Sequence, residues 1–147
     1  MEFDRPPPEP LASAIGFLIS WNGQRMAHTF TGALQPLGLR PPDFGVLTLI
    51  DAHPGTTQQQ LVERSLIDPS SMVAVIDELE EMGLAERRSH PSDRRKHAVH
   101  LTAKGRRTLE RARKVAMGVA EDVLAPLGER ERDDLRRLLR KLAGLDE

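Results

Sequence analysis

The 147-residue chain contains no cysteine. This absence excludes disulfides, thiol nucleophiles, cysteine-based redox sensing and cysteine-containing zinc sites. A signal that this protein senses must therefore arrive by chemistry other than thiol oxidation.

Aromatic residues and long apolar runs are also scarce. Four Phe, one Trp and no Tyr leave few rings for stacking on unpaired bases, which argues against a single-strand binder. No apolar run is long enough for a membrane span, and the first eight residues are acidic and proline-rich, unlike a secretory signal. We therefore expect a cytoplasmic protein with no membrane partner.

The sequence shows no recognisable catalytic apparatus. Gly-rich phosphate loops, a Gly-x-Ser-x-Gly nucleophile elbow and a convincing acid pair are missing. No two histidines have the i, i+4 spacing of a helical metal site, so we interpret all five as solvated or capping residues; they are His28, His53, His90, His97 and His100. We expect no enzymatic activity, no cofactor and no metal. A small hydrolase or metal-dependent enzyme is the weakest interpretation.

Positive charge is concentrated in one stretch. The formal net charge of the chain is -1, yet residues 85–107 hold eight basic and two acidic side chains. Residues 77–84, just before it, hold four acidic side chains and no basic one. A local basic patch is the electrostatic signature of a nucleic-acid contact, although the whole chain is not basic.

Helical periodicity and end signals divide most of the chain into helices. A long helix is predicted from Leu11 to about Leu34, followed by a short one with Asp43 in its first turn. A third is predicted over about 58–64, capped by Thr56 or Thr57. Asp68 and Pro69 begin a fourth, which ends at a glycine. Thr102 caps a long fifth helix, and a leucine-rich sixth follows Gly128.

The period changes from 3.6 to 2 after the fourth helix. Residues 84–89 and 96–101 flank a turn-forming stretch, His90 to Arg95, which predicts a β-hairpin. Short helix, tight turn, second helix and basic hairpin are the order of a winged helix-turn-helix. The predicted fold is therefore mainly α with a small β-hairpin wing.

The predicted helices at the two ends of the chain carry apolar stripes. The winged helix-turn-helix between them, residues 41–101, which we call the reading head, does not need these stripes for its own core. Packing them against a second copy across a two-fold axis would bury both stripes. We expect a homodimer with one intertwined domain: residues 1–40 and 102–147 dimerise, and residues 41–101 bind DNA. The predicted interface residues are Leu11, Ile15, Leu18, Leu109, Ala112, Ala116, Val119, Val123, Leu135, Leu138, Leu142 and Leu145.

Between Leu61 and Arg107 four elements follow one another in a characteristic order and spacing: Leu79-Glu80, Gly83-Leu84, Asp93-Arg94-Arg95 and Leu101-Thr102-x-x-Gly105. In these elements the sequence resembles the MarR (multiple antibiotic resistance regulator) family. The resemblance implies a homodimeric, ligand-responsive transcriptional regulator that binds palindromic double-stranded DNA.

The DNA-binding residues are predicted from the physics of each element. The fourth helix would offer Ser70, Ser71, Val73 and Ala74 to the major groove, and its amino end favours a phosphate. In the family, polar or basic side chains often stand at the places of Val73 and Ala74, so sequence-specific readout could be weak or depend on DNA shape. The remaining predicted contacts are Thr57, Arg64, Arg87, Arg88, Arg94, Arg95 and Lys96, with Asp93 stabilising the wing.

An effector and an alternative function complete the expectations. Trp21, Met26 and Phe30 could line a small-molecule pocket between the dimer helices and the reading head, although core packing explains them equally well. The acidic fourth helix motivates a rival interpretation, in which a winged-helix dimer acts as a protein-interaction module with little DNA binding.

Overall fold

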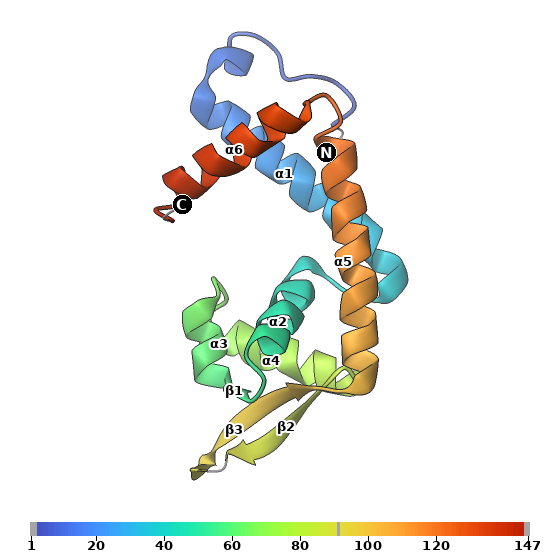
Figure 1. The fold of residues 1–147 in the computed structure, drawn as a ribbon, viewed down its shortest axis with the longest axis vertical. Helices are drawn as coiled ribbons and strands as arrows, with labels where there is room; N and C mark the ends of the chain where they lie inside the picture. Colours follow the sequence, from blue (N-terminus) through green and yellow to red (C-terminus); the bar gives the residue numbers. More distant parts are fainter. Residues whose placement is uncertain (1–2, 91, 146–147) are drawn as a thin grey trace.

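The computed structural model describes residues 3–90 and 92–145, with only the backbone for His90, Arg94 and Arg95. It is mainly helical with one small antiparallel sheet (Figure 1). The elements in chain order are η1 (Leu11–Ser13), α1 (Ile15–Leu34), η2 (Gln35–Leu37), α2 (Pro41–Ala52), β1 (Thr56–Thr57), α3 (Gln58–Arg64), α4 (Pro69–Glu81), β2 (Ala85–His90), β3 (Asp93–Leu101), α5 (Ala103–Val123) and α6 (Glu129–Leu142).

The predicted end signals act as expected at α3, α4 and α5. Thr57, Asp68 and Thr102 each accept a hydrogen bond from the backbone N–H three residues ahead, which satisfies one of the free donors of a helix start. After α4, Gly83 adopts a φ of 72°, a left-handed conformation that glycine tolerates.

The first helix and the second wing strand have other bounds than predicted. The first helix begins at Ile15 and not at Leu11, because Ala14 is extended (φ -87°, ψ 115°) and separates a short 3-10 turn from α1. The second wing strand is longer than predicted, since β3 begins at Asp93 and includes Arg94 and Arg95, which were expected in the turn, whereas β2 keeps the predicted length and is shifted by one residue. The turn is correspondingly shorter.

The sheet has the order β1-β3-β2, with both pairs antiparallel. Thr56 pairs with Val99 and Thr57 with Ala98, so β1 attaches the start of α3 directly to the wing. This two-residue strand was not predicted, because it is too short to show a period of two. It fixes the position of α3 relative to β3.

One hydrophobic core holds the reading head together. Its buried residues come from α2, α3, α4 and the sheet, and also from the end of α1 through Leu34 and from α5 through Leu109 and Ala112. The reading head is therefore continuous with the long helices. A further link between them is the ion pair of Arg113 on α5 with Asp51 on α2, 2.8 Å apart, which raises the pKa of Arg113.

The junction between β3 and α5 explains two of the motif elements. The Thr102 N–H donates to the Leu84 carbonyl at 3.0 Å, and the Thr102 hydroxyl donates to the Gly83 carbonyl at 2.6 Å. Gly105 lies so close that an added Cβ would be 1.9 Å from the Leu84 oxygen. The Gly83-Leu84 and Leu101-Thr102-x-x-Gly105 elements are thus the two sides of one contact.

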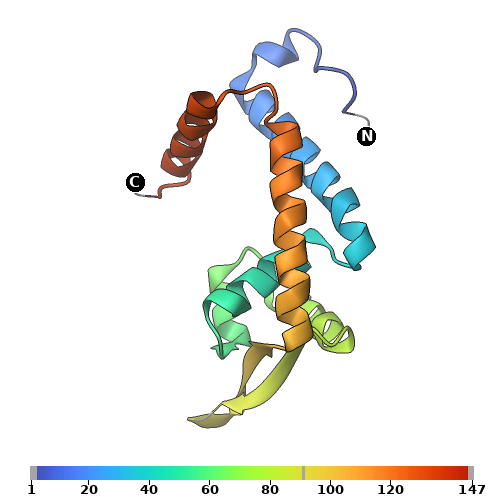
Figure 2. The same cartoon turned by 45° about the vertical axis from the view of Figure 1, so that its right-hand side comes forward.

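The terminal helices form the other end of the molecule. Figure 2 shows α6 (red) set to one side of α1 and α5 and joined to α5 by a loop, and none of its residues is buried. Among the described residues, no helix is both long and apolar enough to cross a membrane.

Candidate nucleic-acid interface

The elements that were predicted to contact DNA gather at one end of the protomer. In Figure 1, α3, α4 and the β2–β3 hairpin lie at the end opposite both chain termini. β1 connects α3 to the hairpin through β3, and α5 rises from the hairpin towards the terminal helices. The fold therefore presents helix, recognition helix and wing together.

The recognition helix α4 presents the four predicted residues to solvent. Met72, Val75, Ile76 and Leu79 face the core and are at most 4% exposed. The opposite face carries Ser70, Ser71, Val73 and Ala74, all of which are exposed. Position on the helix is thus as predicted, whereas the DNA contact itself remains a prediction.

The amino end of α4 is occupied by its own cap. The Asp68 carboxylate accepts the Ser71 N–H at 2.9 Å, the Ser70 hydroxyl at 2.8 Å and the Ser71 hydroxyl at 2.7 Å. These hydrogen bonds, with those of Ser71 first, lower the pKa of Asp68 to about 2. The Asp68 carboxylate therefore occupies the place where a DNA phosphate was expected, and the structure does not support a phosphate contact at this helix end.

The acidic residues of α4 are largely paired with arginines. Asp77 lies 2.8 Å from the guanidinium of Arg87, and Glu80 bonds the same nitrogen. On the other flank, Glu78 lies 2.7 Å from Arg40. Because these carboxylates are paired with arginines, α4 repels a phosphate backbone less than it would with unpaired carboxylates.

Arg87 has a different place from the one expected. Its side chain is only 20% exposed, and it also donates to Gln58 on α3 at 3.3 Å. Because its guanidinium is engaged by α4 and α3, we interpret Arg87 as a positioning residue that joins the wing to both helices, and not as a phosphate contact.

The other wing residues remain candidates. Arg88 is exposed and pairs with Glu86 on its own strand, and Lys96 is exposed on β3. The side chains of Arg94 and Arg95 lie outside the described part of the structure. Asp93 begins β3 in register with His90, and its predicted role in stabilising the wing stays a prediction.

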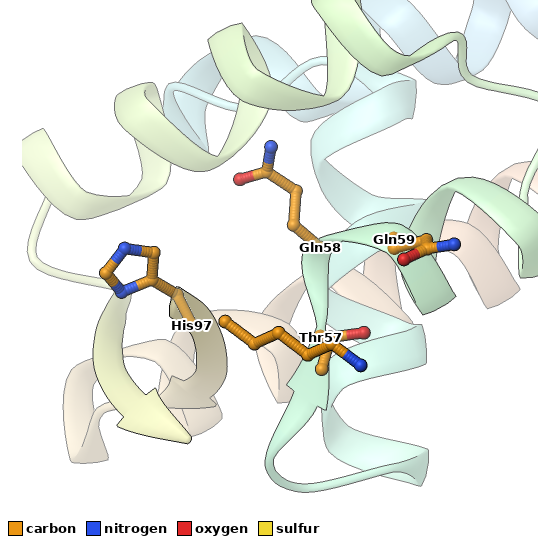
Figure 3. A pocket seen from close by; sticks show the side chains of 5 residues that line it. Thr57, Gln58, Gln59 and His97 are labelled. Atoms are coloured by element: carbon orange, nitrogen blue, oxygen red, sulfur yellow. The ribbon is translucent and has the colours of Figure 1, made fainter. Parts of the chain in front are cut away.

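A shallow cleft lies between the start of α3 and β3, lined by Thr57, Gln58, Gln59, Lys96 and His97. Figure 3 shows His97 on the β3 side and the two glutamines on the α3 side. Gln59 and His97 were not among the predicted DNA contacts, and the fold places them beside the predicted contacts Thr57 and Lys96. Nearby, the predicted contact Arg64 donates to the Thr56 hydroxyl at 3.3 Å.

The three residues suggested for an effector pocket have separate partners. Trp21 packs edge-on against Phe3, with ring centroids 5.4 Å apart, and Phe30 packs against Phe44 of α2 at 5.2 Å. Met26 is half-buried between them along α1. Phe30 belongs to the edge of the core, and the effector pocket itself stays a prediction.

The predicted dimer residues fall into two groups. Leu109 and Ala112 are fully buried within the protomer and Val119 is 6% exposed, so these three are unavailable to a partner; the steps of three and four in α5 reflect packing on α1 and α2. Exposed or half-exposed are Leu11, Ile15, Leu18, Ala116, Val123, Leu135, Leu138, Leu142 and Leu145.

Metal binding has no visible basis in residues 3–90 and 92–145, where no three His, Asp or Glu side chains are grouped suitably for an ion.

The family and its curated members agree with this geometry. The MarR family model matches residues 37–96. The HTH-type transcriptional repressor Rv2887 of Mycobacterium tuberculosis is 31% identical over 87% of this chain and 92% of its own length. A putative transcriptional regulatory protein for the hcr operon of Thauera aromatica is 37% identical over 71% of this chain, which spans 63% of that relative.

Solved structures extend the similarity to nearly the whole chain. The repressor CouR bound to a 23-mer DNA duplex has a TM-score of 0.84 and 35% identity, covering 95% of this chain and 99% of that one. CouR from Rhodococcus jostii RHA1, bound to p-coumaroyl-CoA, has a TM-score of 0.79 and 31% identity, covering 92% and 96%. The chain belongs to the MarR family of winged helix-turn-helix transcriptional regulators.

Proposed function

We propose that this protein is a homodimeric repressor that binds a palindromic operator and is released by a small molecule. The observation that carries the proposal is the separation of two surfaces at opposite ends of one protomer. The reading head lies at one end, and exposed apolar side chains lie at the other, among them Ile15 (77% exposed) and Leu142 (73%).

A second copy is the occupant that fits the apolar end. Two-fold pairing of α1 and α6 would cover the stripes and hold two recognition helices side by side. Half-sites about 34 Å apart, one turn of DNA, would then be read in successive major grooves. The name of the relative Rv2887 and the DNA-bound CouR structure support repression through DNA binding.

Effector release is supported by the ligand-bound CouR structure. A ligand held between the terminal helices and the reading head releases DNA only if it binds one spacing of the recognition helices more tightly than the other. The Arg113–Asp51 pair connects these two parts of the protomer. A mobility-shift assay titrated with p-coumaroyl-CoA is the first test of effector release. If the compound does not release the DNA, it is excluded as the effector, and the proposal of operator binding stands.

The experiment that tests the whole proposal is selection of duplexes from a random pool by the purified protein, followed by light scattering of the complex. A palindrome bound by two protomers is the expected result. The salt dependence of binding should be steep, with a slope of about -0.9 per neutralised phosphate.

The interaction-module alternative was motivated by the acidic residues of α4. Because these residues pair with Arg87 and Arg40, the acidity of α4 is a weaker argument against DNA binding. A titration with the gene's own upstream DNA separates the two: no shift at low salt with micromolar protein would favour the alternative.

A further inference from the structure

The recognition helix is poor in the side chains that usually read bases. Residues 69–83 include no Arg, Lys, His, Asn or Gln. The common bidentate contacts are Arg or Lys to guanine and Asn or Gln to adenine. None of them is available on α4, so its readout depends on the two serines and on apolar side chains.

The hydroxyl hydrogens of both serines are already used. Ser70 and Ser71 donate to the Asp68 carboxylate at 2.8 Å and 2.7 Å. A hydroxyl carries one hydrogen and two lone pairs. Each serine oxygen can therefore face the groove only as an acceptor. In the major groove, acceptors pair with the amino groups of adenine N6 or cytosine N4, and not with guanine O6 or N7.

Apolar side chains provide the other half of the readout. Val73 is 40% exposed although it is large and apolar, and Ala74 beside it is exposed as well. The thymine 5-methyl is the apolar group that the major groove presents to such side chains. A G·C pair offers them none.

We infer that α4 reads A·T base pairs, with Val73 against the 5-methyl group of thymine and the oxygens of Ser70 and Ser71 accepting from adenine N6. An A·T pair presents an amino donor and a methyl group together, whereas a G·C pair presents the amino group alone. The inference rests on the proposed DNA-binding function and specifies the operator: A·T pairs beneath each recognition helix.

Replacement of thymine by deoxyuridine tests the inference, because it removes the methyl group and leaves the pairing edge intact. In a selected duplex, each contacted thymine replaced by deoxyuridine should weaken wild-type binding roughly fourfold, the factor that corresponds to one buried methyl group. Deoxyuridine in the spacer between half-sites should have no effect. Binding is measured by fluorescence anisotropy at fixed salt.

The Val73→Ala variant should bind thymine and uracil duplexes equally. Leu66→Ala is the matched control, because Leu66 is fully exposed just before α4 and lies outside the proposed contact. This control should keep the fourfold preference for thymine, and loss of the preference in it would overturn the assignment to Val73.

Failure of the inference is distinct from failure of DNA binding. Tight binding with equal affinity for thymine and uracil duplexes, or selected operators with G·C pairs beneath α4, would overturn the inference and leave the regulator function intact. No binding to any duplex at low salt would overturn the proposed function itself.

Discussion

The guanidinium of Arg87 on β2 lies 2.8 Å from the carboxylate of Asp77 on α4. The same guanidinium reaches Glu80 and Gln58. Wing, recognition helix and α3 are thereby joined at one side chain, in addition to the β1–β3 pairing. The angle between the wing and α4 is therefore set inside the protein, before DNA is bound.

We expect Arg87→Met to weaken DNA binding without changing its salt dependence. The variant keeps the apolar stem but releases Asp77 and Glu80, at a stability cost of about 1 kcal/mol for a partly exposed pair. Arg94→Gln and Arg95→Gln should instead reduce the salt slope by about 0.9 for each phosphate that the variant no longer neutralises. Fluorescence anisotropy titrations at salt concentrations between about 50 and 200 mM distinguish the two effects. A reduced slope for Arg87→Met would make Arg87 a phosphate contact after all.

Gly105→Ala should destabilise the protein strongly. An added Cβ would lie 1.9 Å from the Leu84 carbonyl oxygen, so α5 must shift from the wing, at a cost of about 3 kcal/mol or more. The matched control is Gly45→Ala on α2, where nothing lies within 4 Å of the added atom and helix propensity predicts a gain of up to about 1 kcal/mol. Urea denaturation measures both, and similar stability of the two variants would contradict the close packing.

Asp43→Asn should alter how stability depends on pH. Asp43 is 2% exposed, and burial raises the pKa of its carboxyl above 3.8, although the Arg40 N–H and guanidinium oppose the shift. A raised pKa in the folded state stabilises the fold below pH 3.8, and this contribution is lost as pH rises through the folded value.

Asparagine cannot ionise and keeps an oxygen for the Arg40 N–H. The stability of Asp43→Asn relative to wild type should therefore increase from pH 3.8 upward and become constant once wild-type Asp43 is fully ionised. Urea denaturation midpoints across this interval provide the measurement. A stability difference that is independent of pH would show that Asp43 has the same pKa in the folded and unfolded states.

Leu142→Asp should produce monomers with low operator affinity. Leu142 is 73% exposed in the protomer, so the change leaves the protomer core intact and places a charge only in the proposed interface. Leu66→Asp makes the same change at another exposed leucine and should leave the dimer unaffected. Light scattering of both variants provides the comparison, and an unchanged dimer with Leu142→Asp would locate the interface elsewhere.

The sequence predicted the helices well because their ends carry local signals. Asp68 with Pro69, Thr102 and Gly83 act through neighbours within a few residues. The two-residue β1 was missed for the opposite reason, since its pairing with Val99 is over forty residues away in the chain. Local pattern cannot reveal such a partner.

The candidate site was predicted at the level of elements more reliably than at the level of side chains. The exposed face of α4 follows from helical period alone. The roles of Arg87, Leu109 and Ala112 depend on what packs beside them: Arg87 meets carboxylates of α4, and the two α5 residues meet the reading-head core. Apolar residues spaced three or four apart show that a helix has an apolar face, but not which neighbouring element that face packs against.

The joint between β3 and α5 is one residue long, because Leu101 ends the strand and Ala103 begins the helix. A helix of 21 residues is about 31 Å long. If α5 tilts by about 5° about the end that lies near the terminal helices, its other end and the base of the wing move by roughly 3 Å. This displacement is on the scale of a base-pair step. In the proposed effector release, a movement of the terminal helices would therefore shift the wing relative to the DNA.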